Sequence, residues 1–412
     1  MYTKINQCRL CGNFKIKHLF SLGEQYLTGV FLNEVDQNIT KGPLSLVKCY
    51  GDDNVCGLVQ LEHTFDSKDM FSEGYGYRSA LNITMVNHLH SNIKILLRHI
   101  SLVSGDIVID IGSNDGTTLK GYDNKNIIKV GYDIAGENYK DYYPSDFILI
   151  NESFNTNSFK SLFKNKKIKI VTAIAMFYDL NDPLHFITEL SSNLEDDGVI
   201  MLEMSYLYHM INNTSYDTIC HEHVGYYSLT QMNWIAVKAK LTIIEFGFNS
   251  INGGSFYIIL KKQKPCNIQS RFLNVEIEKE NYFECENFNI YDKFFNNINS
   301  RKFELITLVN ELISKGKKIG ALGASTKGNV ILQFCELTNA SILCIGEINK
   351  EKVGKFTPGT IIPIIEESTL LCSDIDYLII LPWHFSEFFK NNKKFKNKKL
   401  IFPLPLVQVF NT

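Results

Sequence analysis

A short apolar run that leads into a glycine-bearing turn, GDIVIDIGSNDGTTLKGY, leaves this chain few possible folds. Ile107 to Ile111 have the composition of a strand that is buried on both faces of a parallel sheet. Gly112 and Gly116 allow the backbone to turn sharply and to approach a ligand closely. The order strand, glycine turn, helix predicts an open α/β sheet that binds its ligand at the carboxyl end of this strand.

The next apolar run, IIKVGYD, ends at Asp133, about twenty residues further on. An acidic side chain at this place can accept hydrogen bonds from both hydroxyls of a ribose, which indicates an adenosine-type cofactor. The turn differs from the G-x-G-x-x-G pattern of dinucleotide sites, and it places the Asp115 carboxylate where a pyrophosphate would lie. Repulsion disfavours NAD, whereas S-adenosylmethionine has no phosphate and carries a cationic sulfonium. We therefore expect an S-adenosylmethionine site, with a degenerate nucleotide-binding fold as the alternative.

Two further apolar runs, IKIVTAIAMFYDL and DDGVIMLEMSYL, continue the alternation of strands and helices, and an amphipathic helix beginning near residue 85 precedes the first strand. The expected cofactor-binding residues follow the first three strands: Gly112, Ser113, Asn114, Asp115, Asp133, Ile134, Met176 and Phe177. Phe177 could instead belong to the core. Asp179 is either a site residue or the cap of the next helix. The segment LTIIEFGFNSINGGSFYIILKK is expected to be the strand that follows.

A second strand, glycine turn and helix start occur in KIGALGASTKGNVIL, and here a lysine is present. Backbone amides at a helix N-terminus, together with the ammonium of Lys327, suit a phosphate group. The expected substrate-binding residues of this unit are Ser325, Lys327, Asn329, Glu347 and Lys355. The alternative is an ordinary Rossmann-like turn that carries a surface lysine.

The N-terminal cysteines have the pattern of a structural metal site. CRLCG places Cys8 and Cys11 on one tight turn, and Cys49 and Cys56 can supply the second half of a tetrahedral zinc site. The six residues between Cys49 and Cys56 are more than the usual two to four, so unrelated free cysteines are the alternative. A catalytic zinc is disfavoured because four thiolates leave no open position.

The stretch TICHEHVGYYSL places Glu222 between His221 and His223, and three roles compete for it. A zinc site typically uses H-E-x-x-H on a helix, which this spacing does not match. On an extended segment, His221 and His223 would share one face and Glu222 would lie on the other. An acid–base role is favoured because imidazole titrates near neutral pH, and a satisfied polar loop is the alternative.

The composition restricts the remaining possibilities. A chain of 412 residues is expected to form two or three domains. Its formal net charge of -2, with Lys and Glu evenly scattered, gives no basic surface for nucleic acid or for an anionic membrane. The N-terminus lacks the apolar core of a signal peptide, and no stretch reaches the ~20 apolar residues of a membrane span. We expect a cytoplasmic protein and a monomer, with a small molecule as its partner.

With these residues assembled, the chain resembles the nucleotide-sugar C-methyltransferases that build branched deoxysugars. The resemblance runs nearly end to end and rests on CRLCG with Cys49 and Cys56, YGYRS, DIGSNDGTTL, DTICHEHVGYYSL, NGGS, GASTKGN, KFTPGTIIPI and LPWHF, in this order. It implies an α/β protein with an N-terminal zinc-binding module at 1–80 and a central class I Rossmann-like methyltransferase domain at 81–267. A connecting helix and linker would follow at 268–300, and a second Rossmann-like domain for the nucleotide sugar at 301–412.

The resemblance also implies a reaction. The substrate would be a nucleotide-linked 4-keto-6-deoxy sugar that is methylated at carbon 3 from S-adenosylmethionine, and one zinc ion would be structural. His223 would be the base, Glu222 its partner and His221 a supporting residue, with Tyr75 or Tyr77 of YGYRS as a donor to the ketone oxygen. Methylation of a sugar oxygen or nitrogen, a zinc-stapled scaffold without turnover and a zinc hydrolase are the rival hypotheses.

Three positions depart from the characterised sugar enzymes of this family. Cys220 stands where they have a tyrosine before H-E-H, and Asp179 stands where they have a histidine. Asn252 before GGS also replaces an expected histidine. The departures leave the base unchanged but put the residues around the substrate oxygen, and therefore the particular sugar, in doubt.

Overall fold

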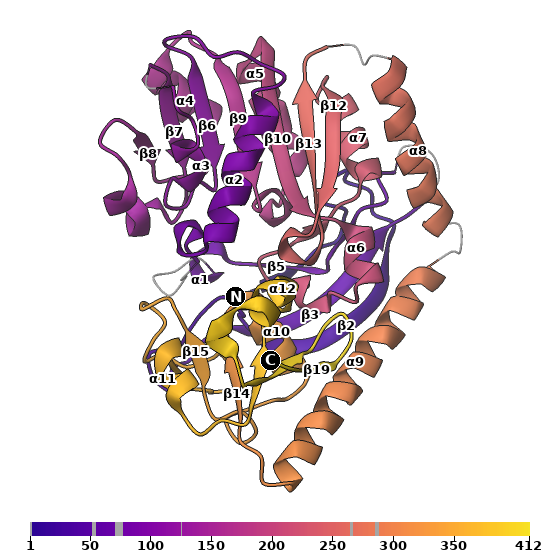
Figure 1. Cartoon of the computed structure of the whole chain (residues 1–412). Coiled ribbons are helices and arrows are strands. Elements are labelled where there is room, and N and C mark those ends of the chain that lie inside the picture. The colour runs from indigo at the N-terminus through magenta and orange to yellow at the C-terminus, as the bar shows by residue number, and fades with distance from the viewer. Residues whose placement is uncertain (1, 52–54, 71–76, 125, 264–266, 285–287) are drawn as a thin grey trace.

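A computed structural model describes residues 2–51, 55–70, 77–124, 126–263, 267–284 and 288–412. The chain forms an upper and a lower lobe that each contain a mostly parallel sheet, and the long N-terminal strands lie between them (Figure 1). Together the sheets and helices confirm the predicted α/β class with two Rossmann-like units.

The upper lobe is built around a seven-stranded sheet in the order β12-β13-β10-β9-β6-β7-β8. All five residues of its central strand β6 are buried, in agreement with the apolar run that predicted it. The strands are β6 (Ile107–Ile111), β7 (Ile128–Tyr132), β8 (Ile148–Ile150), β9 (Ile168–Ile174), β10 (Leu194–Ser205), β12 (Thr242–Asn249) and β13 (Ser255–Lys261). Neighbouring strands from β8 to β10 are parallel, and only β13 runs antiparallel to the others.

The expectation of one strand over LTIIEFGFNSINGGSFYIILKK was wrong, because this segment is a hairpin of β12 and β13. The chain reverses at Asn252, Gly253 and Gly254, whose φ angles are 55°, 90° and 127°. Residues with positive φ end a strand, and glycine adopts such angles without strain.

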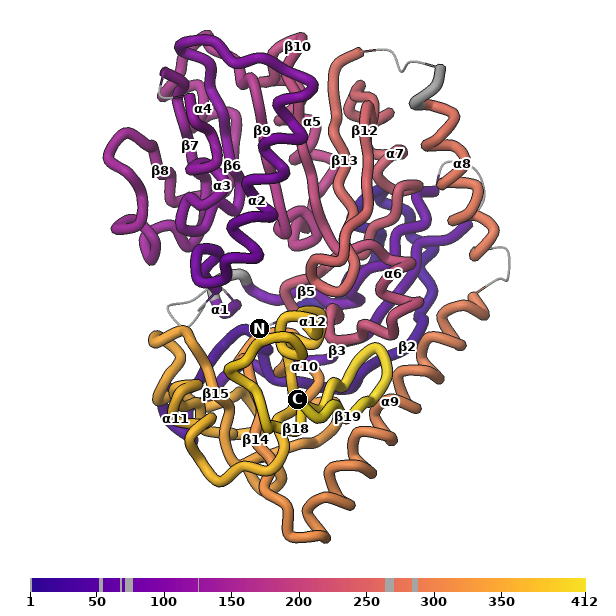
Figure 2. The backbone as a smooth tube through the Cα atoms, in the orientation of Figure 1, coloured from indigo at the N-terminus to yellow at the C-terminus, as the bar shows by residue number. Residues whose placement is uncertain are grey.

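Helices cover the faces of the upper sheet (Figure 2). They are α2 (Ile83–Leu96), α3 (Thr117–Lys120), α4 (Thr156–Phe163), α5 (Pro183–Asn193) and α7 (Leu229–Lys238), whereas α6 (Leu207–Asn212) follows β10 and contacts α9. The predicted amphipathic helix near residue 85 is α2, which buries Met85, Leu89, Ile93 and Leu96 along one side. The side chain of Asn82 caps it by accepting from the Thr84 amide at 2.9 Å.

The N-terminal segment contributes a small pair of strands, β1 (Tyr2–Lys4) with β5 (His63–Phe65), and then the short helix α1 (Ser67–Met70). Its main sheet has the order β11-β4-β3-β2 and contains β2 (Ile16–Tyr26), β3 (Lys41–Cys49) and β4 (Val59–Leu61). The fourth strand, β11 (Gly225–Tyr226), comes from the histidine loop and pairs antiparallel with β4. The N-terminal sheet is therefore completed by a segment more than 150 residues away in the chain.

The lower lobe contains a six-stranded sheet in the order β16-β15-β14-β17-β18-β19. Its strands are β14 (Ile319–Leu322), β15 (Ile345–Glu347), β16 (Ile364–Glu366), β17 (Tyr377–Ile380), β18 (Lys399–Phe402) and the antiparallel edge strand β19 (Gln408–Asn411). Three helices accompany them: α10 (Thr326–Phe334), α11 (Glu367–Cys372) and α12 (Ser386–Asn391). The helix α10 follows β14 directly, as the glycine turn predicted.

Two long helices, α8 (Asn267–Glu284) and α9 (Asn289–Ser314), connect the lobes along one side of the molecule (Figure 1). The sequence predicted one helix and a linker here. Helix α9 buries Tyr291, Phe294, Ile298, Leu305 and Val309 at helical spacing, and the ring of Phe294 packs against Phe20 of β2. No helix in the described ranges is both long and apolar enough to cross a membrane.

A buried carboxylate fastens α8 to the upper lobe. Glu280 is 2% exposed, and its oxygens accept from the backbone amides of Leu229 and Thr230, each at 2.8 Å, at the start of α7. The hydroxyls of Tyr206 and Ser228 donate to the same carboxylate at 2.7 and 2.8 Å. A negative charge at a helix N-terminus is also favoured by the helix dipole.

We predict that Glu280→Gln lowers the free energy of unfolding by about 2 kcal/mol, because the amide group of glutamine would face donors that are then left unsatisfied. Urea unfolding followed by circular dichroism measures the change. The matched control is Glu278→Gln, which alters an exposed residue of the same helix and should change the stability by less than about 0.5 kcal/mol. Equal midpoints for Glu280→Gln and the wild type would contradict the fastening role.

Candidate functional site

The cofactor side of the site lies at the carboxyl ends of β6 and β7. Gly112 and Gly116 have φ angles of 69° and 72°, so the chain turns there in a way that favours glycine. Asp133 follows β7, and its two carboxylate oxygens accept from the amides of Asn114 at 2.8 Å and Ala135 at 2.7 Å. These bonds hold the carboxylate beside the glycine turn, and its role as a ribose-binding acid stays a prediction.

Asn114 and Asp115 are turned toward the segment that precedes α2. Asn114 accepts from the Ser79 amide at 3.0 Å and donates to the Tyr77 carbonyl at 2.9 Å. Asp115 is 1% exposed and accepts from the Ala80 amide at 3.0 Å. The Asp115 carboxylate is therefore directed into the protein, where it orders this segment, and its charge lies beneath the turn instead of on its open side.

The other expected cofactor residues differ in exposure. Ile134 is 49% exposed and Met176 is half-buried beside Gly112, so both border open space at this edge. Ser113 is buried and accepts from the Tyr143 hydroxyl at 2.8 Å. Phe177 has no exposed surface and packs against Phe186 and Tyr227, which favours the core interpretation of its side chain.

Only part of the YGYRS motif can be placed. Tyr75 lies outside the described residues. Tyr77 is 47% exposed, and its carbonyl accepts from Tyr139 at 2.8 Å as well as from Asn114. The backbone at Tyr77 is thus attached to the cofactor edge.

The histidine loop forms a tight turn. The His223 amide donates to the Cys220 carbonyl at 3.2 Å, and the turn brings the side chains of Cys220, Glu222 and His223 within 4.8 Å of one another. The prediction that His221 and His223 share one face was wrong, because that prediction assumed an extended chain. His221 points the other way, against Phe65 with ring centroids 4.5 Å apart.

The hydrogen bonds of His223 define its tautomer. Its Nδ1 lies 2.8 Å from the Thr218 carbonyl, and a carbonyl can only accept, so Nδ1 carries the proton. The other nitrogen, Nε2, is then the proton acceptor. Burial lowers the pKa of His223 to about 3, and the ammonium of Lys327 contributes in the same direction, so the ring is neutral at physiological pH.

The acidic groups around His223 have raised pKa values. Burial raises the pKa of Glu222 to about 7, and the ammonium of Lys352 partly offsets that effect. Burial and then the neighbouring Glu222 carboxylate raise the pKa of Asp179 well above its usual value. The Oδ1 atom of Asp179 is buried and has no hydrogen-bond partner within the described ranges. Burial therefore favours the protonated form of Asp179, and Glu222, whose pKa is raised to about 7, is partly ionised near neutral pH.

Cys220 and His221 are both buried. Burial and the Glu222 carboxylate raise the pKa of the Cys220 thiol well above its usual value, so it is a neutral group 4.0 Å from Glu222. Burial lowers the pKa of His221 to about 4, and the ring stays neutral against the carbonyl of Gly42. These contacts place His221 against the N-terminal sheet.

The lower lobe presents Lys327 to this loop. The ammonium of Lys327 donates to the Asn252 carbonyl at 2.7 Å, which joins the first turn of α10 to the β12–β13 hairpin. Burial lowers the pKa of His384 to about 3, and Lys327 contributes here as it does at His223. Lys327 is thus close enough to both imidazoles to lower their pKa values, whereas the charge of a lysine on an open surface would be screened by solvent.

The remaining expected substrate residues have structural partners. Ser325 caps α10 by accepting from the Gly328 amide at 3.0 Å. Glu347 accepts from the Ala324 amide at 2.8 Å and so fixes the glycine turn. Asn329 is fully buried, and its amide group donates to the Thr28 carbonyl at 2.7 Å. Lys355 is half-buried, after β15.

Several residues around the loop were not assigned a role from the sequence. The ring of Tyr178 lies 4.1 Å from that of His223, and Trp383 donates to buried Asp217 at 2.8 Å, one residue before Thr218. A tryptophan directly after an apolar strand was a weak signal for such a contact. The approach of Lys352 to Glu222 had no signal, because it depends on how the lobes pack.

The four N-terminal cysteines meet as predicted. Sγ–Sγ distances are 3.5 Å for Cys8 and Cys56 and 3.6 Å for Cys11 and Cys49, and all four sulfurs lie within 4.8 Å of one another. Tetrahedral zinc with Zn–S bonds of ~2.3 Å requires sulfurs about 3.8 Å apart. The cluster therefore fits a zinc ion, which would crosslink the start of the chain to both ends of the β3–β4 connection.

The protein class follows from the sheet and its carboxyl edge. Seven strands with one antiparallel member next to the edge, a glycine turn after β6 and an acid after β7 define the fold of the class I S-adenosylmethionine-dependent methyltransferases. Three family models match in order: "Putative zinc binding domain" at residues 8–71, "Methyltransferase domain" at 85–245 and "C-methyltransferase C-terminal domain" at 250–405. The chain therefore combines matches to a zinc-binding domain, a methyltransferase domain and a C-methyltransferase C-terminal domain.

Known proteins that are similar to this chain include one curated relative and several solved structures. The C-methyltransferase NovU of Streptomyces niveus is 24% identical over 99% of this chain and 97% of its own length. Among solved structures, magnesium protoporphyrin IX methyltransferase from Synechocystis PCC 6803 is 13% identical, with a TM-score of 0.33 over 44% of this chain and 88% of its own. The cyclopropane synthase MmaA2 of Mycobacterium tuberculosis is 12% identical, with a TM-score of 0.33 over 41% of this chain and 82% of its own.

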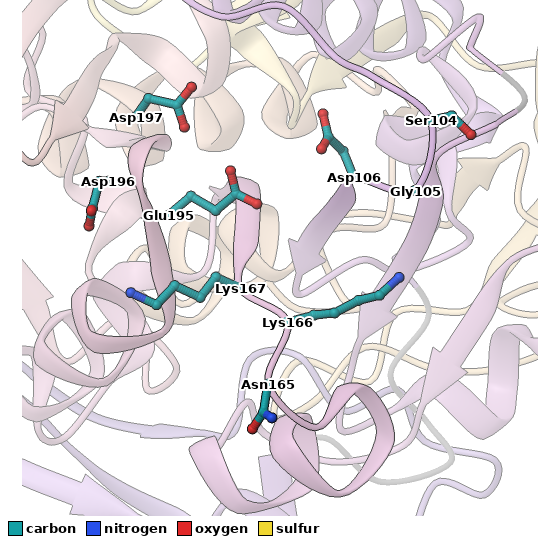
Figure 3. Close-up of a pocket in the computed structure, with 9 residues that line it drawn as sticks. All are labelled: Ser104, Gly105, Asp106, Asn165, Lys166, Lys167, Glu195, Asp196 and Asp197. Atoms are coloured by element: carbon teal, nitrogen blue, oxygen red, sulfur yellow. The ribbon is translucent and has the colours of Figure 1, made fainter.

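A surface hollow in the upper lobe lies away from these residues (Figure 3). It is lined by Ser104–Asp106, Asn165–Lys167 and Glu195–Asp197, at the amino ends of β6 and β9 and the first half of β10. Lys169 already pairs with Glu195 and Asp197. Because ligands of such sheets bind at the carboxyl ends, this hollow is not the candidate site.

We predict that Asp133→Ala weakens the binding of S-adenosylmethionine by about 10–100-fold, because the variant loses the charged acceptor of the hydrogen bonds to the ribose. Isothermal titration calorimetry measures the affinity, and thermal melting confirms that the variant is folded. The control is Asp141→Ala, at an exposed position further along the same connection. An unchanged affinity in folded Asp133→Ala would contradict the ribose assignment.

Proposed function

We propose that this protein methylates carbon 3 of a nucleotide-linked 4-keto-6-deoxy sugar. The observation that carries the proposal is the hydrogen bond from Nδ1 of His223 to the Thr218 carbonyl, which leaves Nε2 as a proton acceptor. The loop that holds this base lies between the cofactor edge of the upper sheet and Lys327 of the lower lobe. The family resemblance supplies the class of substrate.

The chemistry begins with proton abstraction. The ketone at carbon 4 acidifies the C–H bond at carbon 3, Nε2 of His223 takes that proton, and the electron pair moves to the ketone oxygen. The protonated carboxyl of Asp179 can donate to this oxygen, and such a donor contributes about 3 kcal/mol. The ionised fraction of Glu222 can stabilise the imidazolium that forms.

S-adenosylmethionine, when bound at the β6–β7 edge, supplies the electrophilic methyl group that the substrate carbon accepts. Gly112, Asp133 and Met176 would hold it there. The hydrogen bond from Asp179 would weaken when the enolate returns to the ketone, and His223 would release its proton to solvent afterwards.

The charge of Lys327 suggests how the substrate activates the base. Its ammonium is one cause of the low pKa of His223. A diphosphate bound at the start of α10 would neutralise that ammonium, and the pKa of His223 would rise toward its usual value. The base would then become stronger only when the nucleotide is in place.

We predict that the wild type gains one methylene of mass on at least one dTDP-, GDP- or CDP-linked 4-keto-6-deoxy sugar, and that it exchanges the carbon 3 hydrogen in deuterated water without S-adenosylmethionine. His223→Asn should slow this exchange by about 10²–10⁴-fold, because the base is lost. NMR follows the exchange, and calorimetry should show unchanged cofactor affinity.

The control His185→Asn alters an exposed histidine of the same lobe and should behave as the wild type. Methyl transfer without exchange would indicate an oxygen or nitrogen acceptor. Absence of any mass gain across the panel, or full exchange in His223→Asn, would contradict the proposal.

A further inference from the structure

A buried segment that continues from the end of β2 runs between the histidine loop and the lower lobe. We call residues 26–32 (YLTGVFL) the strap; apart from half-buried Tyr26, all of its residues are buried. It begins with Tyr26, the last residue of β2, so it belongs to the N-terminal part of the chain. Its burial shows that protein surrounds it on several sides.

The lower lobe holds the strap at three places. Gln333 of α10 accepts from the Tyr26 amide at 2.8 Å and donates to its carbonyl at 3.1 Å. Asn329 of the same helix donates to the Thr28 carbonyl. Leu32 and Phe356 exchange two backbone hydrogen bonds of 2.9 and 2.8 Å. The position of the strap is therefore set by α10 and by the segment that contains Phe356.

Gly29 stands at the centre of the strap, directly against Glu222. A methyl group on its Cα would lie 2.0 Å from Oε1 of Glu222 and 3.2 Å from Cδ. On the same position, the Thr326 hydroxyl of α10 would be 3.5 Å away. A methyl group at Gly29 would therefore overlap the Glu222 carboxylate and would also touch the first turn of α10.

We propose that Gly29 is a positioning residue whose missing side chain lets the Glu222 carboxylate lie beside His223, and that the strap fixes this position relative to α10. This inference rests on the proposed role of His223 and Glu222. It adds a residue that contacts neither cofactor nor reacting atoms, and it links the predicted nucleotide site on α10 to the acid–base pair.

Two features separate this role from a purely structural one. The φ angle of Gly29 is not in the left-handed region, so alanine can adopt the same backbone conformation. The atom that the methyl group would strike is the end of a flexible side chain, which can rotate away. The expected response to Gly29→Ala is thus a folded protein with a displaced carboxylate.

The experiment compares Gly29→Ala, Glu222→Gln and the double variant. Gly29→Ala should lower kcat by about 10²-fold, the usual effect of misplacing a catalytic group by about 1 Å, with little change in KM or in cofactor affinity. The pH–rate limb near 7 that reports Glu222 should move or disappear. In the Glu222→Gln background, Gly29→Ala should lower kcat by less than threefold.

Two further variants guard against misinterpretation. Thr28→Ser removes a methyl group from the neighbouring strap residue and should leave kcat and the pH profile unchanged. Glu222→Asp shortens the side chain and makes room for the new methyl group, so Gly29→Ala should be less harmful in that background. The proposal would be overturned if Gly29→Ala lowered kcat in either Glu222 background by the same factor as in the wild type.

Crystal structures of the wild type and Gly29→Ala give a readout that does not depend on the substrate. A displaced Glu222 carboxylate beside an unchanged strap supports the inference even if no sugar on the panel is methylated. A Glu222 carboxylate in its wild-type place, or a collapsed strap, would overturn it.

Discussion

The pairing of β11 with β4 is the interaction on which the site depends. Gly225 and Tyr226 pair with Gln60 and Val59, and the amide of Leu61 donates to the Val224 carbonyl at 3.0 Å. The residue after His223 is thereby fixed to the N-terminal sheet. The cysteine cluster holds both ends of the β3–β4 connection, and Arg9, between two of the cysteines, donates to the His63 carbonyl at 3.0 Å. A metal at the cysteines would therefore stabilise the histidine loop from a distance.

The loop needs this support because it carries polar groups that are expensive to bury. An unpaired polar group in an apolar environment costs several kcal/mol, and the buried Nδ1 atom of His221 in this loop has no hydrogen-bond partner in the described chain. Three contacts from elsewhere in the chain hold the loop in place: the β4 pairing, the Trp383–Asp217 hydrogen bond and the close packing of the strap against Glu222. Each comes from a different part of the chain, so the site forms only when the three parts pack together.

The sequence predicted the parts of this arrangement that follow from local patterns. The apolar run at 107–111 predicted a buried strand, and the glycine turns predicted that helices begin after β6 and β14. The pattern of the N-terminal cysteines predicted that the four thiols lie together. The sequence did not predict side-chain orientation at turns, because a single residue in a turn conformation changes which side chains share a face. For that reason His221 lies outside the site, against Phe65. The inward orientation of the Asp115 carboxylate also had no signal in the sequence. The contact of Gly29 with Glu222 depends on the packing of distant segments and had no local signal.

The most direct test of this account removes the metal and leaves the upper lobe intact. The measurement is the rate of substrate deuterium exchange in Cys49→Ala protein that has been freed of zinc, with cofactor affinity determined on the same sample. The account predicts wild-type affinity for S-adenosylmethionine, because the β6–β7 edge is untouched, together with an exchange rate at least about tenfold lower, because β4 no longer holds the loop. Wild-type exchange in the zinc-free protein would contradict it.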